Sequence, residues 1–397
     1  MTFFKELSAS AFTAGFVAVL VGFTSSVAIV FQAAQAFNAT PAQIASWMWA
    51  LGIGMGLCTL LPSLYYKKPI MVAWSTPGAA VLATAGVAGG FGMADAVGAF
   101  MVSAALITLF GMTGWFEKLL NRIPVAIASA LLAGVLARFA ISGFTAAQTA
   151  LPLVLLMLAV YLLGKRLMPR YAVVATLLAG IAYAAARGEL AWSAVSLTLT
   201  VPVFVMPQFS FSAVVSLAIP LFVVTMASQN LPGVAAIRAT GYEGQIPVSK
   251  VITMTGLATL ALAPFGAFAL NLSAITAAIV MGKEAHTDPE KRYTAAVSCG
   301  LIYLVIGVFG AAVTSLLAAF PKELVAAIAG LALLGTIGAG LAAAVKDESH
   351  REAALITFLV TLSGVVIAGI GSAFWGVVAG ALALFVQQYG QAKNKLS

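Results

Sequence analysis

Long apolar runs separated by short polar patches follow one another along the whole chain. The first half holds seven runs, Ala11–Gln32, Ile44–Leu64, Pro69–Ala88, Asp95–Trp115, Pro124–Ala140, Ala150–Leu167 and Tyr171–Ala186. The second half holds seven more, Phe211–Ile237, Val248–Phe265, Gly266–Met281, Ala295–Phe320, Pro321–Val345, Ala353–Ile370 and Phe374–Gln388. About 20 apolar helical residues cross the hydrocarbon core of a bilayer. The pattern predicts an all-α polytopic membrane protein with 14 transmembrane segments, of which the third and tenth are short.

Composition narrows the class of protein further. With 62% hydrophobic residues, 8% charged residues and a mean hydropathy of +1.07, the 397-residue chain has too little polar surface for a water-soluble globule. The net charge of +8 is spread over small clusters between apolar runs, so no basic stripe for nucleic acid is expected. Cys58 and Cys299 lie inside apolar runs, without disulfide or metal-ligand spacing. Because no catalytic or phosphate-binding motif occurs either, we expect a protein that is not an enzyme.

The two halves resemble each other in detail as well as in order. A Phe-Gly pair stands in the fourth element of each half, at positions 110 and 309, and a proline opens each fifth element. Aligning the short third elements makes Ser75 equivalent to Asn271. We therefore divide the chain into a first repeat over 9–188, a connection along the periplasmic surface over 189–210, and a second repeat over 211–390.

The basic residues define an orientation. If the N-terminus is inside and every element crosses once, seventeen of the 20 Lys and Arg fall inside, Arg187 and Lys322 fall outside, and Arg138 remains within a span. Such asymmetry supports the crossing count and places both termini on the cytoplasmic side; the membrane expected for the chain is the inner (plasma) membrane of a bacterium. The first apolar run is too long for a signal peptide and is read as a retained span. Because seven is odd, the second repeat is inverted relative to the first.

Each short element begins with an extended stretch interrupted by Pro or Gly and ends in small helix formers. This pattern predicts a strand that turns into a half-helix near the middle of the membrane, where irregular backbone is tolerated only beside a cavity. Two half-helices entering from opposite sides would point their positive N-termini at each other and form an anion site without a basic side chain. The residues at those N-termini are Ser75, Thr76 and Gly78 in one copy and Asn271, Leu272 and Ser273 in the other. A helix start that is merely capped is the alternative for the first copy.

The first element of each half supplies the remaining polar side chains. These are Ser25 and Ser26, with Thr24 and Gln32, in one half, and Gln229 and Asn230, with Ser228, in the other. Amides within a membrane usually face the bundle interior or a pathway. We expect Gln229 and Asn230, which precede a predicted helix break at Leu231-Pro232-Gly233, to contact ligand rather than only link helices. For the two serines, close packing is an equal alternative.

Charged groups are missing from the predicted membrane interior. All 12 Asp and Glu map to loops or span ends, so no carboxylate is available at depth to carry a proton. A coupled proton would have to travel with the substrate or through a span-end group such as Asp95 or Glu323. Arg138, predicted two residues before the end of the fifth element, is either a functional group or a side chain that reaches to the interface.

Three motifs carry a family resemblance over nearly the whole chain. Residues 74–80 (WSTPGAA), 220–230 (PLFVVTMASQN) and 371–376 (GSAFWG) resemble the bacterial benzoate:proton symporter family. The resemblance implies an architecture similar to the uracil and sulfate-permease transporters, with a core domain over 9–120 plus 211–320 and a gate domain over 121–188 plus 321–390. It also implies an elevator-type movement of core against gate, often in a homodimer.

The resulting prediction is a secondary active transporter in contact with membrane lipid that imports benzoate or a similar aromatic carboxylate, with the proton as coupling ion and no cofactor. The residues expected to bind the small organic anion are Ser75, Thr76, Gly78, Gln229, Asn230, Asn271, Ser273, Ser25 and Ser26, with Phe23, Trp74 and Phe268 packing on its ring. Each of these aromatic residues could instead be core. A carrier of the same fold for another anion or a nucleobase and a passive anion channel are the alternatives. The nucleobase branch uses carboxylates in its eighth and tenth elements, which this sequence lacks.

Overall fold

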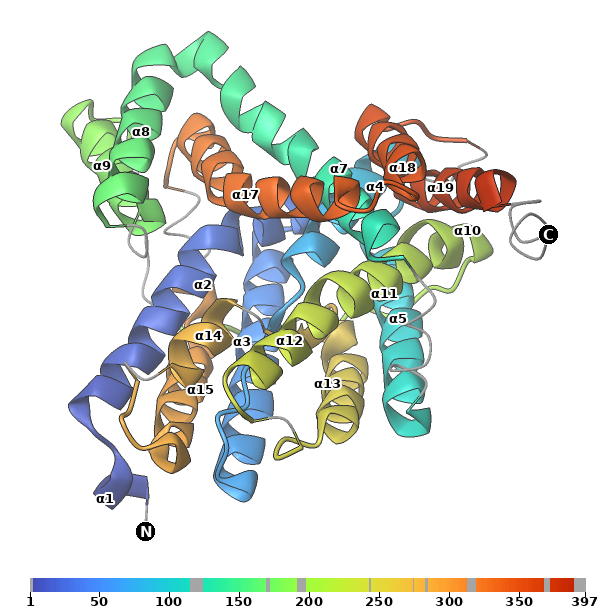
Figure 1. Cartoon of the computed structure of the whole chain (residues 1–397). Coiled ribbons are helices and arrows are strands. Elements are labelled where there is room, and N and C mark those ends of the chain that lie inside the picture. Colours follow the sequence, from blue (N-terminus) through green and yellow to red (C-terminus); the bar gives the residue numbers. More distant parts are fainter. Residues whose placement is uncertain are drawn as a thin grey trace.

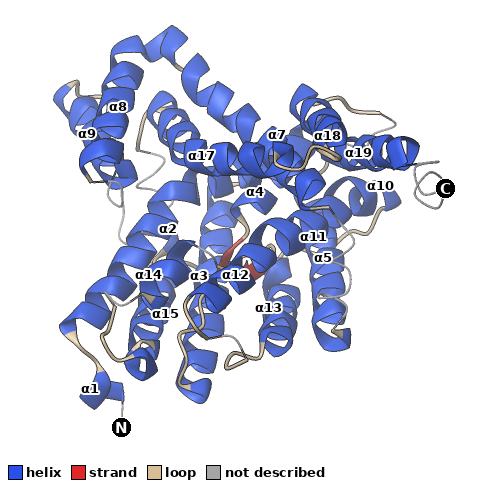
Figure 2. Ribbon diagram, in the orientation of Figure 1, coloured by secondary structure: helices blue, strands red, loops and turns tan. Residues whose placement is uncertain are grey.

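The structure is a computed structural model of the whole chain, almost entirely helical (Figures 1 and 2). It describes residues 3–114, 124–168, 172–190, 198–242, 244–273, 275–282, 285–312, 319–367 and 372–388. Within these residues, six helices are long and apolar enough to cross a membrane on their own. The fold is therefore that of a polytopic helical membrane protein, as predicted, while the crossing count of 14 stays a prediction.

The first half begins with a short helix and then follows the predicted order. Its elements are α1 (Phe3–Glu6), α2 (Ala9–Ala36), α3 (Pro41–Tyr66), β1 (Val72–Trp74), α4 (Thr76–Gly89), α5 (Met93–Thr113), α7 (Val125–Thr145), α8 (Ala147–Leu167) and α9 (Ala172–Ala186). Local chemistry sets several starts. The Ser8 side chain accepts the Ala11 N–H at the beginning of α2, and Thr40 and Gln43 form a reciprocal capping box at the beginning of α3.

The second half repeats this order with one difference in its first segment. Residues 211–239 form a succession of helical pieces, α10 (Phe211–Ala213), η3 (Val214–Ala218), α11 (Ile219–Thr225), η4 (Met226–Asn230) and α12 (Leu231–Ala239). Both η3 and η4 are π-helical turns. The remaining elements are α13 (Val248–Leu262), η5 (Ala263–Phe265), β2 (Leu270–Leu272), α14 (Ile275–Met281), η6 (Pro289–Lys291), α15 (Tyr293–Val308), α17 (Lys322–Val345), α18 (Arg351–Ser363) and α19 (Ser372–Gln388).

Helices α7 and α18 end elsewhere than predicted. Helix α7 continues to Thr145 instead of stopping at Ala140, because no residue after 140 breaks it. Helix α15 ends at Val308, whose carbonyl accepts the N–H of Thr200 from the connection between the halves, and residues 310–312 are helical again; part of the way to the predicted segment end at 320 lies outside the described residues. Helix α18 ends at position 363, because Gly364 adopts a left-handed conformation with φ of 70° and forms the C-cap.

The two halves are packed crosswise. The second helix of each half packs against the fourth segment of the other, α3 on α15 and α13 on α5. Figure 1 shows α7, α8, α9, α17, α18 and α19 grouped at the top of the view, above the bundle that contains α2, α3, α13 and α15. The most extensive packing in the upper group is between α7 and α17. The division into core and gate that the resemblance implies stays a prediction.

The strands β1 and β2 form an antiparallel ribbon in the middle of the bundle (Figure 2). Ala73 lies opposite Asn271, the Ser75 N–H donates to the Ala269 carbonyl, and the Ser273 N–H donates to the Met71 carbonyl. These reciprocal bonds make Ser75 equivalent to Ser273. The equivalence of Ser75 with Asn271 expected from the sequence is therefore wrong by two residues, because the sequence alignment could not see the register of the ribbon.

Residues 198–210, at the end of the connection between the repeats, run without helix across the ends of several helices. The Ser46 hydroxyl at the start of α3 accepts the N–H of Val203 at 2.9 Å and donates to the Phe265 carbonyl at 2.9 Å. The Gln208 N–H donates to the Ala94 carbonyl at the start of α5. This segment therefore fastens the ends of α3, α5 and η5 to one another.

Close helix contact at Gly52 generates the first prediction. A Cβ on Gly52 would lie 2.5 Å from the Cα of Gly307 in α15, where backbone cannot give way. We expect Gly52→Ala to lower the free energy of unfolding by about 1–3 kcal/mol through overpacking. Thermal unfolding in detergent would measure the change, with Gly338→Ala as control because nothing lies within 4 Å of a Cβ there. Equal melting temperatures for the two variants would contradict this account of the α3–α15 contact.

Candidate functional site

The N-terminus of α4 is built by Ser75. This residue is fully buried and is the N-cap of α4, where its Oγ accepts the Gly78 N–H at 3.0 Å and the Thr225 hydroxyl donates to it at 3.1 Å. Pro77 has no N–H. The first turn of α4 therefore presents the Thr76 N–H as its remaining backbone donor, beside a Thr76 side chain that is partly exposed.

The matching half-helix, α14, starts with a hydroxyl pair. Ser273 Oγ and Thr276 Oγ1 lie 2.5 Å apart, and both side chains are buried. Thr276 occupies the position equivalent to Gly78, and sequence reasoning missed it. At the far end of α14 the buried Arg292 donates from Nη1 to the Met281 carbonyl at 2.9 Å. A cation at the C-terminus of a helix complements its dipole, so Arg292 stabilises the helix whose N-terminus faces the ribbon.

The π turn η4 brings the predicted amides to the ribbon. Asn230 is fully buried; its Oδ1 accepts the Leu272 N–H of β2 at 2.9 Å and its Nδ2 contacts the Met226 sulfur at 3.2 Å. Ser228 and Gln229 on the same turn are partly exposed, and no described residue hydrogen-bonds to their side chains. The predicted helix break is thus a π turn that continues into α12, and such turns are frequent at functional sites.

An aromatic pair lies beside the ribbon on the side of α2. The Phe23 and Trp74 ring centroids are 5.5 Å apart. The Trp74 indole N–H donates to the Ser26 hydroxyl at 2.9 Å, and that hydroxyl donates in turn to the Gly22 carbonyl at 2.9 Å. Trp74 is buried while Phe23 is partly exposed. The side chain of Ser25 lies outside the described residues.

Phe268 belongs to a different cluster. Its ring centroid lies 5.6 Å from that of Trp47 and 6.0 Å from that of Phe100, and all three side chains are buried. The core alternative for Phe268 is therefore favoured over ring stacking on a ligand. Its neighbours come from α3 and α5, whereas the Phe23–Trp74 pair joins α2 to β1.

Asn271 is the centre of the ribbon and is fully buried. Its Nδ2 donates to the Ala269 carbonyl at 3.0 Å, and its Oδ1 has no hydrogen-bond partner among the described residues. A buried polar atom without a partner is costly and calls for an explanation.

Hydrogen bonding divides the predicted site residues into two groups. One group is engaged with the protein itself and holds the ribbon and half-helices in place: Ser26, Ser75, Gly78, Asn230 and Ser273. The other group is partly exposed with no side-chain hydrogen bond from a described residue: Phe23, Thr76 and Gln229. The second group has the free hydrogen-bonding and ring surface that a ligand could use.

The elements α2, β1, α4, α11, η4, β2 and α14 contain no charged residue. Of the two helices that pack on the ribbon, α3 contains none either, and α13 has Lys250 in its first turn, nine residues before Thr259, which bonds to β2. The two acidic side chains considered for a proton path, Asp95 and Glu323, accept hydrogen bonds at helix ends. Asp95 accepts the Gly92 N–H at 3.2 Å at the start of α5, and Glu323 accepts the Thr149 hydroxyl at 3.4 Å. Polarity at the ribbon comes from N–H groups, hydroxyls and amides alone.

Arg138 lies within α7 rather than at its end. Its guanidinium packs on Gly364, at the C-terminal turn of α18, and its Nη1 is buried without a hydrogen-bond partner. A cation placed at a helix C-terminus interacts favourably with the helix dipole. This contact between α7 and α18 gives Arg138 a structural role within the upper group of helices.

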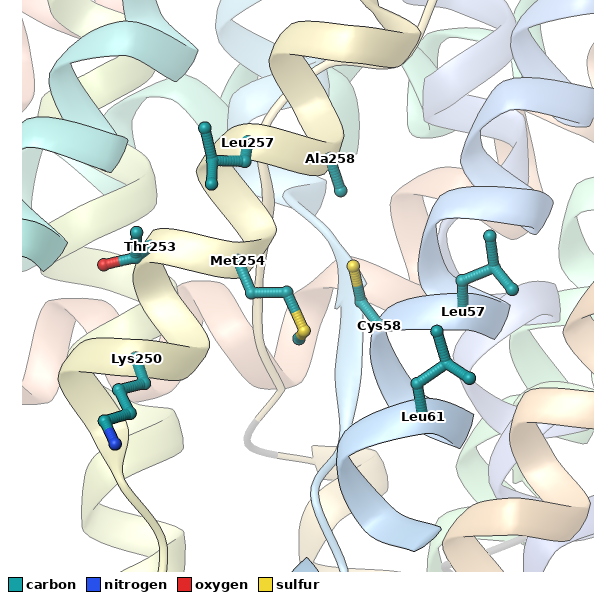
Figure 3. Close-up of a pocket in the computed structure, with 8 residues that line it drawn as sticks. All are labelled: Leu57, Cys58, Leu61, Lys250, Thr253, Met254, Leu257 and Ala258. Atoms are coloured by element: carbon teal, nitrogen blue, oxygen red, sulfur yellow. The ribbon is translucent and has the colours of Figure 1, made fainter. Parts of the chain in front are cut away.

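A groove between α3 and α13 is the wrong kind of space for the anion (Figure 3). It has a volume of about 500 Å³ and is lined by Leu57, Cys58, Leu61, Lys250, Thr253, Met254, Leu257 and Ala258. Leu61 and Leu257 are 54% and 51% exposed, so the groove opens on the outside of the bundle. Figure 3 shows Lys250 at one end, Thr253 on the next turn of α13, and apolar or sulfur-containing side chains along the rest. The groove is thus separate from the polar groups at the ribbon.

Comparison with known proteins agrees with this geometry. The profile of a family described as benzoate membrane transport protein matches residues 5–386. The chain belongs to that family. Members of the family are membrane transport proteins, so this chain is a multi-pass inner-membrane transport protein and not an enzyme.

Two curated relatives cover nearly the whole chain. The inner membrane protein YdcO of Escherichia coli (strain K12) is 47% identical over 382 residues, which are 96% of this chain and 97% of the relative. The benzoate membrane transport protein of Acinetobacter baylyi is 38% identical over 382 residues, 96% of each chain. The predicted resemblance to benzoate transporters is confirmed.

Solved structures share the fold at low sequence identity. The transmembrane domain of the cyanobacterial bicarbonate transporter BicA superposes with a TM-score of 0.56 at 14% identity, over 96% of this chain and 97% of that one. SLC26A9 superposes with a TM-score of 0.61 at 12% identity, over 95% of this chain and 65% of that one. The predicted inverted-repeat transporter fold is confirmed at this level, while the count of seven segments in each repeat stays a prediction.

The division of site residues generates the second prediction. We expect Ser75→Ala to lower the free energy of unfolding by about 0.5–2 kcal/mol, because the cap of α4 is lost. Gln229→Leu should leave it within about 0.5 kcal/mol, because no protein hydrogen bond is broken. Thermal unfolding of both purified variants in detergent would compare them. A larger loss for Gln229→Leu than for Ser75→Ala would show that the two groups are wrongly assigned.

Proposed function

We propose that the protein is a secondary active transporter that imports benzoate or a similar aromatic carboxylate together with protons. The observation that carries the proposal is the pairing of two half-helix N-termini with an aromatic pair at a ribbon that has no charged residue. Membership of the benzoate membrane transport protein family supports it. So does the name of the Acinetobacter relative, which is 38% identical over 96% of both chains.

The ligand would lie with its carboxyl group toward the half-helices and its ring toward α2. Thr76 and Gln229 are the direct polar contacts in this proposal, because their side chains are partly exposed and free of protein hydrogen bonds. Phe23 would pack on the ring, held in place by Trp74. Ser75, Asn230 and Ser273 would act indirectly by fixing the backbone donors at the ribbon.

The movement would be of the elevator type. The ribbon and every residue of the site belong to the core domain over 9–120 plus 211–320, and α7 of the gate packs near α4 and η4. A rigid core that slides along the gate would carry the site from one side of the membrane to the other. The distribution of Lys and Arg leads us to place both termini in the cytoplasm. We also propose a homodimer, in which contacts between the two gate domains would keep the gates fixed.

Uptake into proteoliposomes gives the third prediction. Labelled benzoate should accumulate above its equilibrium level when the outside is more acidic, and uptake should saturate, because an alternating-access carrier has a limited number of sites. Protein-free liposomes measure the diffusion of undissociated acid, which must be subtracted. Saturable uptake whose rate does not depend on the pH gradient would overturn proton coupling. Uptake that does not saturate with benzoate concentration would indicate a channel. Competition by unlabelled anions and nucleobases would identify a different substrate.

The aromatic contact gives the fourth prediction. We expect Phe23→Ala to raise the KM for benzoate roughly 2- to 10-fold, because a ring contact contributes about 0.5–1.5 kcal/mol. Phe12→Ala on the same helix is the control, since Phe12 is 51% exposed on the outer surface. Initial rates of uptake over a range of benzoate concentrations would give both values. An unchanged KM for Phe23→Ala would remove this residue from the site.

A further inference from the structure

The unpaired acceptor at the centre of the ribbon carries an inference about the form of the substrate. Asn271 is 0% exposed, and no residue in the described part of the chain hydrogen-bonds to its Oδ1. Its Nδ2 donates to the Ala269 carbonyl at 3.0 Å. Exchanging the two atoms would set an oxygen against that carbonyl oxygen, so this bond fixes the orientation of the amide. The ribbon therefore holds one oriented acceptor without a donor.

Register places this acceptor beside accessible space. Asn271 lies directly opposite Ala73, and side chains that are directly opposite share a face with Cβ atoms about 5 Å apart. The Ala73 side chain is partly exposed although it stands in the middle of the bundle. Because strand side chains alternate, Ser75 and Ser273 belong to this same face. An occupant that reaches Ala73 is thus within reach of Asn271.

The hydrogen-bonding groups that remain free near Ala73 and Asn271 differ from those of a site built for an anion. Donors remain at the Thr76 N–H and in the Gln229 amide, and β1, β2, α4, η4 and α14 contain no cation to neutralise a carboxylate. An ionised carboxylate has only acceptors, so its lone pairs would face the lone pairs of Asn271 Oδ1. A carboxylic acid has one O–H donor and one carbonyl acceptor, which complements a site of one acceptor and several donors.

We propose that the site binds the undissociated acid, with the acid O–H donating to Asn271 Oδ1 and the acid carbonyl accepting from the half-helix donors. This inference rests on the proposed function. On the outside, the carboxylate takes up one proton from the external solution. The neutral acid is carried across the membrane and releases the same proton into the internal solution. Burying a neutral acid costs far less than burying an unpaired charge. Proton coupling then needs no carboxylate on the protein, which accounts for the absence of acidic residues from the ribbon elements.

Competition on the wild-type protein tests the proposal without any variant. Benzamide has a carbonyl acceptor and an N–H donor in the arrangement of the acid and does not ionise, whereas methyl benzoate has no donor. We expect benzamide, but not methyl benzoate, to inhibit uptake of labelled benzoate at neutral pH. If unlabelled benzoate competes and benzamide does not, the anion is the bound form and the inference fails while the proposed function stands. Equal inhibition by both neutral compounds would also overturn it, because no donor would be needed.

Charge movement provides an independent test. One acid proton moving with one carboxylate carries no net charge, so the initial rate of uptake at a fixed pH gradient should be the same at inside-negative and inside-positive potentials set with potassium and valinomycin. A rate that follows the potential would overturn the inference. Absence of any benzoate accumulation in the uptake experiment above would instead overturn the proposed function, which keeps the two failures distinct.

A variant then assigns the acceptor to Asn271. We expect Asn271→Leu to raise the half-saturating benzoate concentration about tenfold and to weaken inhibition by benzamide equally, because both ligands lose the same hydrogen bond. Gln35→Leu, which removes an exposed amide from α2, is the matched control. Thermal unfolding confirms that each variant is folded. Unchanged affinity in a folded Asn271→Leu protein would overturn the role of this residue.

Discussion

The rest of the structure depends on the pairing of two three-residue strands in a place where water cannot satisfy their backbone. Extended backbone cannot hydrogen-bond to itself, and unsatisfied N–H and C=O groups within a membrane cost several kcal/mol each. The two strands satisfy each other along one edge. On the outer edges, side chains replace missing strands: Thr59 accepts the Val72 N–H and Thr259 accepts the Leu270 N–H, each at 3.1 Å. Strands from opposite repeats must therefore assemble together.

This constraint explains why so many polar side chains at the ribbon are unavailable to a ligand. Asn230 satisfies the Leu272 N–H and Ser75 satisfies the Gly78 N–H, and both are fully buried. Both side chains are needed because a strand and a helix start in the middle of a membrane have backbone N–H groups that water cannot satisfy. The same arrangement leaves other groups free, because a helix start always has more donors than its cap can accept. Residues that support the ribbon and residues proposed to bind the ligand thus lie next to each other in the same short segments.

The sequence predicts the architecture well and the site only in part. Span order and the inverted repeat follow from the spacing of apolar runs, since burial in lipid selects for length and hydropathy alone. The family follows from three local motifs. The register of the ribbon could not be predicted, because shifting by two residues preserves the alternation of sides; hence Ser75 matched Asn271 instead of Ser273. Thr225 and Thr276 were missed because an isolated threonine in an apolar helix usually bonds only to its own backbone. Phe268 was misplaced because an aromatic residue before a strand can face either the core or the ligand.

The lack of charge at the ribbon is itself informative about a carrier. A buried Arg or Lys would bind a carboxylate strongly, but the pair must be desolvated on loading and separated on release, and both steps cost free energy. N–H groups, hydroxyls and amides fixed by the ribbon are held in place before a ligand arrives, so in the proposed site they would lose little on binding and need no counter-charge when the site is empty. Such groups provide moderate affinity and easy release on either side. A transporter must bind and release its substrate in every cycle. A ribbon held by Asn230, Ser75, Thr59 and Thr259 is better suited to this than an ion pair.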